Sequence, residues 1–244
     1  MKINIKRFNK ELSSNAQLDE FNVRKTNLLQ ALIEIKKEID PTLTFRCGCR
    51  SGVCGSCAVR VNGIEKLACK TNLNENDFIK PINNSNILKD LVVDVSHETL
   101  LISKLNLTID ANIESIQVSQ EDVKNIDLQS NCILCNSCYS SCPVYDVNKE
   151  FLGPFALTRA LRYVNDKKNA NRLNIIDSIQ TNGVWDCTLC SACTLVCPQG
   201  IDPKADIMQL QNISVQNGYS NPYTQNFDFN SFGDDFGGFN PNGF

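Results

Sequence analysis

The sequence predicts an α+β chain of two domains, and three observations support this division. Residues 2–8 alternate polar and apolar side chains, as a half-buried strand does. Beyond about residue 98, apolar residues instead recur at helical spacing. Cysteine motifs occur in both parts, and their spacing in the first part differs from that in the second. We therefore expect one domain at residues 1–96, a helical domain at 97–217 and a disordered tail rich in Asn, Gly and Phe at 218–244.

The first forty residues read as two strands and a helix. The segment around Phe21 and Val23 is expected to pair with the first strand as a hairpin. Thr26 is expected to cap a helix that Asp40 and Pro41 end. The apolar face of this helix would consist of Leu28, Leu29, Leu32, Ile33 and Ile35.

A cysteine-rich loop follows this helix. Cys49, Cys54, Cys57 and Cys69 reproduce the C-x4-C-x2-C…C spacing of a plant-type 2Fe-2S site. Interleaved glycines suit a loop that wraps around a cluster, because they permit positive φ and close approach of backbone N–H groups. Strand, strand, helix and cysteine loop is the order of a β-grasp ferredoxin, which is the fold we predict for the first domain.

Two other residues near this domain receive no role. Cys47 lies two residues before Cys49, but only Cys49 gives the required interval, so we expect Cys47 to be a small, partly buried side chain. His97 is the only histidine, and we expect a surface or linker position for it. Short strands are expected at 58–61, 67–68, 78–82 and 91–95, with Asn62-Gly63 as a hairpin turn.

Two similar cysteine runs dominate the second domain. Both have the spacing C-x2-C-x2-C-x3-C-P, in which three thiolates converge on one cubane cluster and the fourth reaches a second cluster. The two runs therefore complete each other. We predict that one 4Fe-4S cluster is held by Cys132, Cys135, Cys138 and Cys197, and that a further cluster is held by Cys142, Cys187, Cys190 and Cys193.

Zinc and disulfides explain these cysteines less well. Structural zinc uses two separated C-x2-C pairs and would leave the third cysteine of each run without a role. A disulfide scaffold is typically short and secreted, whereas this sequence has 244 residues and opens without an apolar leader segment. We therefore expect the thiols to be kept for metal.

Two helices are expected around the runs. Ser119 precedes acidic residues and resembles a helix start. Gly153-Pro154 opens a second helix, whose opposite face we expect to be solvated. Its apolar face would consist of Ala156, Leu157, Ala160, Leu161 and Val164, and its charged face of Arg159, Arg162, Asp166 and Lys167.

Charge and hydropathy exclude several functions. The net charge is -3 and the basic residues are scattered, so we expect no nucleic-acid partner. The sequence holds no run of the roughly 18 apolar residues that a membrane-spanning helix needs. We therefore expect contact with a membrane only through other subunits.

The motifs together resemble a family, the iron-sulfur subunits of succinate dehydrogenase and fumarate reductase. The resemblance covers residues 2–210 and comprises several motifs in the same order. They are C-R-S-G-V-C-G-S-C at 49–57, L-A-C at 67–69, L-K-D-L-V-V-D at 88–94, the two runs at 132–143 and 187–198, G-P-F-A-L-T-R-A-L-R-Y at 153–163 and V-C-P-Q-G-I-D-P at 196–203.

The resemblance implies an electron-transfer subunit of an oxidoreductase, with no catalytic residues of its own. Such a subunit connects an FAD-containing subunit, where succinate and fumarate interconvert, to a quinone-reactive membrane subunit. It also implies a peripheral location on the cytoplasmic membrane, at the cytoplasmic face. The alternative is a stand-alone multi-cluster ferredoxin, which would not need the motifs at 88–94 and 153–163. A third class, the iron-sulfur arm of heterodisulfide- or glycolate-type oxidoreductases, generally lacks the first domain.

The sequence departs from the common family pattern in the second run and after the first. Most members lack a cysteine at the position of Cys190 and hold a 3Fe-4S cluster, so Cys190 predicts 4Fe-4S here; the alternative is a bystander thiol beside a 3Fe-4S cluster. The usual tryptophans after Pro143 are replaced, and Thr188 stands where histidine is common. These changes resemble the subgroup whose anchor subunit is itself cysteine-rich.

Overall fold

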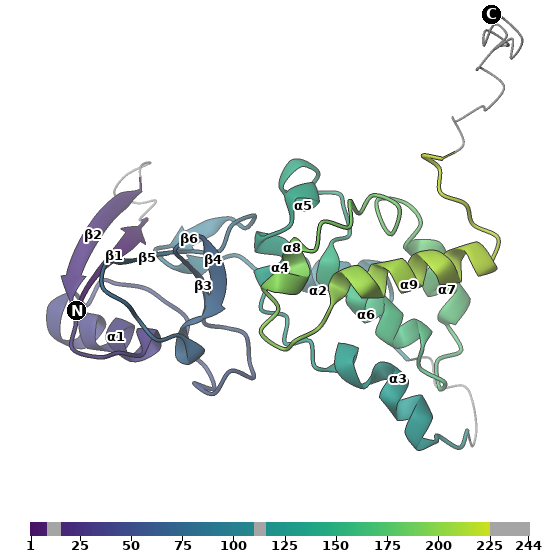
Figure 1. Cartoon of the computed structure of the whole chain (residues 1–244), viewed down its shortest axis with the longest axis horizontal. Coiled ribbons are helices and arrows are strands. Elements are labelled where there is room, and N and C mark those ends of the chain that lie inside the picture. Colours follow the sequence, from purple (N-terminus) through teal and green to yellow (C-terminus); the bar gives the residue numbers. More distant parts are fainter. Residues whose placement is uncertain (9–15, 110–115, 225–244) are drawn as a thin grey trace, which may run out of the picture.

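The computed structural model describes residues 1–8, 16–109 and 116–224, and has a β-rich part and a helical part side by side (Figure 1). Each part has its own cluster of buried apolar side chains. The predicted tail overlaps the described residues only at 218–224, and its remainder lies outside them. The last strand ends at Val93 and the next helix begins at His97, close to the predicted junction.

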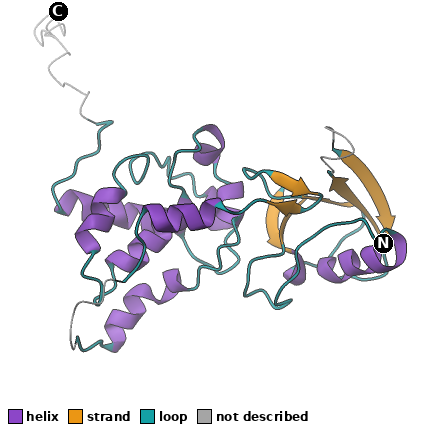
Figure 2. Cartoon of the chain, turned by 180° about the vertical axis from the view of Figure 1, so that it is seen from behind, coloured by secondary structure: helices purple, strands orange, loops and turns teal. Residues whose placement is uncertain are grey.

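The strands, orange in Figure 2, gather in the β-rich part. Five of them form one sheet in the order β2-β1-β5-β3-β4. β1 pairs antiparallel with β2 and parallel with β5, while β3 and β4 form the hairpin predicted around Asn62-Gly63. A separate two-stranded sheet joins β6 and β7. The strands are β1 Lys2–Arg7, β2 Gln17–Asn22, β3 Ala58–Val61, β4 Ile64–Leu67, β5 Asp77–Lys80, β6 Ile87–Lys89 and β7 Val92–Val93.

Apolar side chains at alternate positions of β1 pack into the core beneath this sheet. Ile3 and Ile5 are fully buried, as the polar-apolar pattern predicts. The helix α1 (Leu28–Glu34) buries its apolar face, and a π-helical turn at Ile35–Ile39 carries the chain to Asp40. Its cap is Asn27 rather than the predicted Thr26, because the Asn27 side chain accepts the Gln30 N–H at 3.2 Å.

Other strand predictions need correction at their ends. The strand expected at 78–82 is β5, which ends at Lys80, and the one expected at 91–95 is the two-residue β7. Its partner β6 was not predicted, because three residues are too few to show a period.

Arg7 is the centre of a charged cluster at the end of β1. Its guanidinium contacts Asp90 at 2.9 Å, Asp40 at 2.5 Å and Asp19 at 3.2 Å. The Asp90 side chain is only 1% exposed. Hydrogen bonds from Thr42 and then from Arg7 lower the pKa of Asp40 to about 2. The cluster therefore ties β1 to the loops after α1 and β6.

Arg7→Met is expected to lower the free energy of unfolding by about 3 kcal/mol, because the buried Asp90 loses its cation. Denaturant titration of the full chain measures this. The ordinary pKa of Asp40 lies above its folded value, so its stabilising effect is complete at neutral pH and disappears as the pH falls towards 2. Lys2→Met removes the exposed 2.7 Å Lys2–Glu20 pair and serves as the control, with an expected loss of about 0 to 1 kcal/mol. Equal losses in both variants would contradict the burial argument.

The helical part packs around α6. Figure 1 shows α9 alongside α6, with α3 on the outer side of the domain. The predicted starts of α3 and α6 are confirmed, since Ser119 caps α3 in a capping box and Pro154 opens α6. The helices are α2 His97–Lys104, α3 Gln120–Ser130, α4 Ser137–Ser140, α5 Pro143–Val147, α6 Pro154–Val164, α7 Arg172–Ser178, α8 Ala192–Leu195 and α9 Pro203–Gln216.

The predicted apolar face of α6 is fully buried, but its charged face is not simply solvated. Asp166 is buried and pairs with Arg162 at 2.9 Å. Lys167 contacts Asp122 of α3 at 3.1 Å. Sequence periodicity cannot show that a neighbouring helix covers part of a charged face.

His97 was expected at a surface or linker position; it lies at the junction between the last strand and α2, but it is not exposed. The ring is half-buried, stacks on Tyr145 and lies 5.2 Å from the ring of Tyr139. Burial lowers its pKa. The aromatic partners lie more than forty residues further along the sequence, so no local pattern could reveal them.

Polar contacts and close packing join the two parts of the chain. Ser140 of α4 accepts the Asn83 N–H at 2.8 Å and donates to Glu65 of β4 at 2.6 Å. The Gln199 side chain donates to the Gly52 carbonyl at 3.0 Å. The Ser140 contacts join the β-rich part to the first run, and the Gln199 contact joins the first cysteine loop to the residue that follows the second run. None of the helices in the described ranges is long and apolar enough to cross a membrane.

Candidate iron-sulfur sites

The loop between α1 and β3 turns its backbone N–H groups towards thiols. Ser51 and Val53 each donate to Sγ of Cys49 at 3.4 Å, and Cys49 donates to Sγ of Cys54 at the same distance. Ser56 lies 3.1 Å from Sγ of Cys54. Donors directed at sulfur favour the thiolate, which is the form that binds iron.

The thiols of this loop differ in their surroundings. Hydrogen bonds from Ser51 and then Val53 lower the pKa of Cys49 to about 5. Burial raises the pKa of Cys57 to about 11, with further contributions from Cys69 and Cys54. The four predicted ligands therefore form one interacting group, exposed at Cys49 and buried at Cys57.

Cys47 is exposed rather than partly buried as predicted. Its position follows from the loop, which runs over the surface before it turns inward at Cys57. We assign no role to Cys47.

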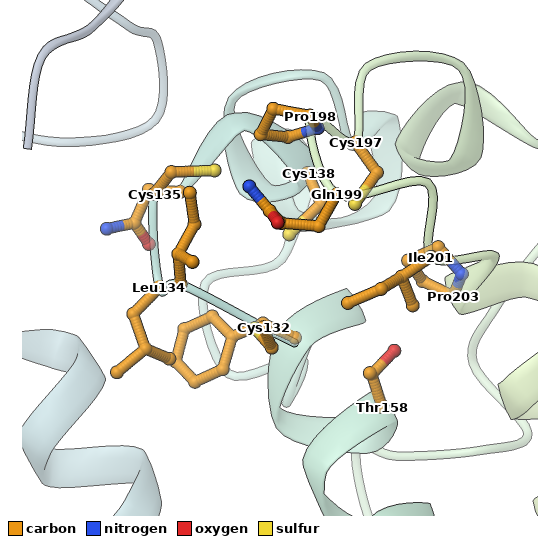
Figure 3. A pocket seen from close by; sticks show the side chains of 13 residues that line it. Cys132, Leu134, Cys135, Cys138, Thr158, Cys197, Pro198, Gln199, Ile201 and Pro203 are labelled. Carbon is orange, nitrogen blue, oxygen red and sulfur yellow. The ribbon is translucent and has the colours of Figure 1, made fainter. Parts of the chain in front are cut away.

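A small pocket of about 30 Å³ lies between the first run and the end of the second. Figure 3 shows Cys132, Cys135, Cys138 and Cys197 around it, with Thr158 of α6 on one side. Burial raises the pKa of Cys132, Cys135 and Cys138, and neighbouring thiolates in the group raise it further. Cys197 of the second run therefore lies beside the first three cysteines of the first run, as the spacing predicts.

Four of the five remaining thiols form a third group. Burial raises the pKa of Cys193 to about 12, and negative charge on Cys187, Cys142 and Cys190 raises it too. Cys142 and Cys187 also interact with Cys190. Negative charge on Cys193 also raises the pKa of Cys138 in the second group, so the second and third groups adjoin.

Both runs have the same backbone conformation. Leu134 and Asn136 in the first run have φ of 53° and 61°, and Leu189 and Ser191 at the matching positions have 54° and 67°. A short helix follows at the same place in each run, α4 in one and α8 in the other. Left-handed residues other than glycine are uncommon, so their repetition indicates two equivalent cradles.

The chemistry of these groups fits clusters rather than single ions. In the described ranges, no three or more Cys, His, Asp or Glu side chains converge closely enough to hold one metal ion. A cluster places several iron and sulfide atoms between its thiolates, which therefore stand further apart than the ligands of one ion. Buried thiols with raised pKa values also need iron's positive charge to ionise.

The 2Fe-2S loop and the first run touch at Gly55. A methyl group on Gly55 would lie 2.7 Å from the carbonyl oxygen of Ile133 and 2.9 Å from Cβ of Cys135. Gly55 stands between Cys54 and Cys57 in sequence, so the contact joins ligands of the first group to a ligand of the second.

Sequence reasoning missed a buried carboxyl behind the pocket. Asp206 of α9 accepts hydrogen bonds from Gln129 and Thr158, both at 2.8 Å. Burial raises its pKa. The only sequence signal was its place near the start of α9, where an acidic residue normally favours the helix dipole and needs no partner.

Comparison with known protein families identifies two iron-sulfur domains in the chain. Residues 2–99 match the model of the 2Fe-2S iron-sulfur cluster binding domain. Residues 129–201 match the model of the 4Fe-4S dicluster domain. The predicted division into a 2Fe-2S domain and a second domain with two clusters is thereby confirmed.

Relatives match the chain along most of its length. The chain is 36% identical over 234 residues to the fumarate reductase iron-sulfur subunit of Haemophilus influenzae, covering 86% of this chain and 91% of that protein. It is 33% identical over 231 residues to the succinate dehydrogenase iron-sulfur subunit of Paracoccus denitrificans, covering 88% of each. Its fold matches a chain of the Mycobacterium smegmatis Sdh1 complex in the apo form, with a TM-score of 0.76, 23% identity and coverage of 90% and 97%. The chain belongs to the family of succinate dehydrogenase and fumarate reductase iron-sulfur subunits.

Proposed function

We propose that this subunit carries electrons between an FAD-containing subunit that interconverts succinate and fumarate and a quinone-reactive membrane subunit. The observation that carries the proposal is the arrangement of twelve cysteines in three adjoining groups, with the loop of the first packed on the run of the second. Iron-sulfur clusters supply one-electron chemistry when bound. The chain's own residues hold them, exclude water from the buried thiols and fix their separation.

The proposed ligand sets follow the three groups. The 2Fe-2S cluster belongs to Cys49, Cys54, Cys57 and Cys69 in a β-grasp domain at residues 1–96. The first 4Fe-4S cluster belongs to Cys132, Cys135, Cys138 and Cys197, and the third cluster to Cys142, Cys187, Cys190 and Cys193, in the helical domain at 97–217. The repeated backbone of the two runs supports 4Fe-4S for the third cluster.

The partners and location follow from the family. A flavoprotein subunit and a membrane anchor would flank this subunit at the cytoplasmic face of the membrane. Thr188 and the residues after Pro143 differ from the common quinone-site pattern. They support a cysteine-rich anchor subunit.

Co-purification tests the proposal against a free ferredoxin. The native complex should contain flavin and oxidise succinate or reduce fumarate with an artificial dye. EPR of the reduced complex should show 2Fe-2S and cubane signals. A chain that purifies alone with all its clusters, and for which no flavin subunit can be captured, would favour the stand-alone carrier.

A further inference from the structure

A buried carboxyl, that of Asp206 in α9, lies directly behind the pocket of the first 4Fe-4S site. Thr158 lines this pocket, and its hydroxyl donates to Oδ2 of Asp206 at 2.8 Å. Pro203 lines the pocket too, and it lies one turn before Asp206 on the same face of α9. Figure 3 shows Thr158 and Pro203 on one side of the pocket. One side chain, that of Thr158, therefore connects the Asp206 carboxyl to the wall of the site.

The hydrogen bonds of Asp206 fit an ionised carboxyl. Gln129 of α3 donates to Oδ1 at 2.8 Å, and Thr158 donates to Oδ2. A carboxylate accepts on both oxygens, whereas a protonated carboxyl must donate from one of them. The first turn of α9 also favours negative charge, because the N–H groups of that turn point towards the start of the helix. Asp206 is thus arranged to carry a negative charge beside the site.

No Lys, Arg or His in the described ranges forms an ion pair with Asp206. Gln129 and Thr158, which face it from α3 and α6, are neutral, and the thiols of the site lie beyond Thr158. The charged group that acts on it from its own helix is another carboxylate, Asp202. Burial raises the pKa of Asp206 more than its two hydrogen bonds lower it, and Asp202 raises that pKa further. Additional negative charge nearby would strengthen its affinity for a proton again.

We propose that Asp206 is a redox-linked proton site, which binds one proton when an electron arrives at the first 4Fe-4S site and releases it when the electron leaves. The proposal rests on the proposed function, because it requires a cluster at that site. The neighbouring 2Fe-2S cluster is oxidised as it donates the electron. The proton leaves an acid in the solvent, such as the buffer, and forms an O–H bond on Asp206. Because the coupling is reciprocal, reduction and protonation favour each other by the same factor.

The coupling makes the midpoint potential of the first cluster depend on pH. At high pH, Asp206 is ionised whether the cluster is oxidised or reduced, and its negative charge opposes reduction. At low pH, it is protonated in both states and opposes reduction no longer. Between these limits, the midpoint potential falls as the pH rises.

An EPR-monitored redox titration of the intact complex, repeated between about pH 5 and pH 9, tests the proposal. In the wild type, the ratio of reduced to oxidised first cluster at a fixed potential should fall about tenfold across this range, which is about 59 mV for a one-electron couple. Asp206→Asn keeps the size of the side chain and an acceptor oxygen but carries no charge. In this variant, the ratio should stay at the acidic value of the wild type throughout.

Two further variants separate the effect of charge from that of structure. Thr158→Val removes one donor to Asp206 with little change in volume, so the pH-dependent step should persist but move to higher pH. Asp166→Asn also removes a buried carboxyl of the helical domain, but Asp166 does not line the pocket and is paired with Arg162 at 2.9 Å. It should leave the wild-type pH profile unchanged.

A wild-type potential that is independent of pH, or a pH-dependent step that survives in Asp206→Asn, would overturn the inference and leave the proposed function intact. Equal loss of the step in Asp166→Asn would overturn it too. If Asp206→Asn does not fold, the wild-type profile and its shift in Thr158→Val decide. Absence of cluster signals from the wild-type complex would instead refute the proposed function.

Discussion

Cys190→Ser is expected to convert the third cluster from 4Fe-4S to 3Fe-4S. Cys190 has the same place in the second run as Cys135 in the first, and the flanking residues Leu189 and Ser191 repeat the left-handed conformation of Leu134 and Asn136. Its charge also acts on Cys142, Cys187 and Cys193, which are the other proposed ligands. Without a fourth thiolate, one corner iron loses its ligand and is released.

EPR of the oxidised, anaerobically purified complex detects this change. The wild type should show little or no 3Fe-4S signal, whereas Cys190→Ser should show about one per complex, with one iron fewer by metal analysis. Cys47→Ser is the matched control, because Cys47 is also exposed but lies outside all three groups. A full 3Fe-4S signal in the wild type that Cys190→Ser leaves unchanged would make Cys190 a bystander thiol.

Gly55→Ala is expected to separate the 2Fe-2S loop from the first run and to lower the free energy of unfolding by about 4 kcal/mol. The added methyl group would lie 2.7 Å from a backbone oxygen and 3.0 Å from Cα of Cys135, and neither backbone atom can move without shifting the run. Gly55 also has φ of 71°, which alanine adopts at a cost. Since electron tunnelling falls steeply with distance, transfer from the 2Fe-2S cluster should slow as well.

Gly63→Ala serves as the control that has the backbone strain without the close contact. The difference between the two variants then gives the effect of the Gly55 contact. Gly63 has φ of 85°, yet an added methyl group there would meet only Arg60 Nη2, at 4.0 Å. It should cost about 1 kcal/mol from backbone strain alone. Thermal unfolding compares the stabilities, and dipolar coupling between the reduced clusters in EPR compares their separations. Equal unfolding losses and unchanged coupling would show that the Gly55 contact does not set the distance.

Most of the chain's architecture was predictable, because its strongest signals are local. The alternation in β1, the proline that opens α6 and the Ser119 capping box each involve residues within one element. The cysteine spacings are local too. They are specific signals because one cluster requires several thiolates at particular spacings. Their grouping across the two runs followed from that chemistry rather than from any helix or strand pattern.

The errors concern contacts between segments far apart in sequence. The burial of His97 was missed because its aromatic neighbours, Tyr139 and Tyr145, lie in and just after the first run. Asp166 looked solvated because its burial depends on how the helices around α6 pack. Asp206 gave no sign of its partners Gln129 and Thr158 for the same reason. Tertiary packing decides such positions, and a single sequence does not encode it locally.

The exchange of Cys142 and Cys197 between the two runs has a consequence for folding. Each helical-domain cluster would join cysteines from both runs, and the chain between those cysteines contains α6 and α7. Closing so long a loop with metal removes conformational entropy from the unfolded chain, and the binding free energy of the metal then becomes part of the folding free energy. Neither cluster can be completed while the other run is displaced. Under iron limitation, unfolding of the whole helical domain should therefore become less cooperative. The effect should not be confined to the loss of one cluster.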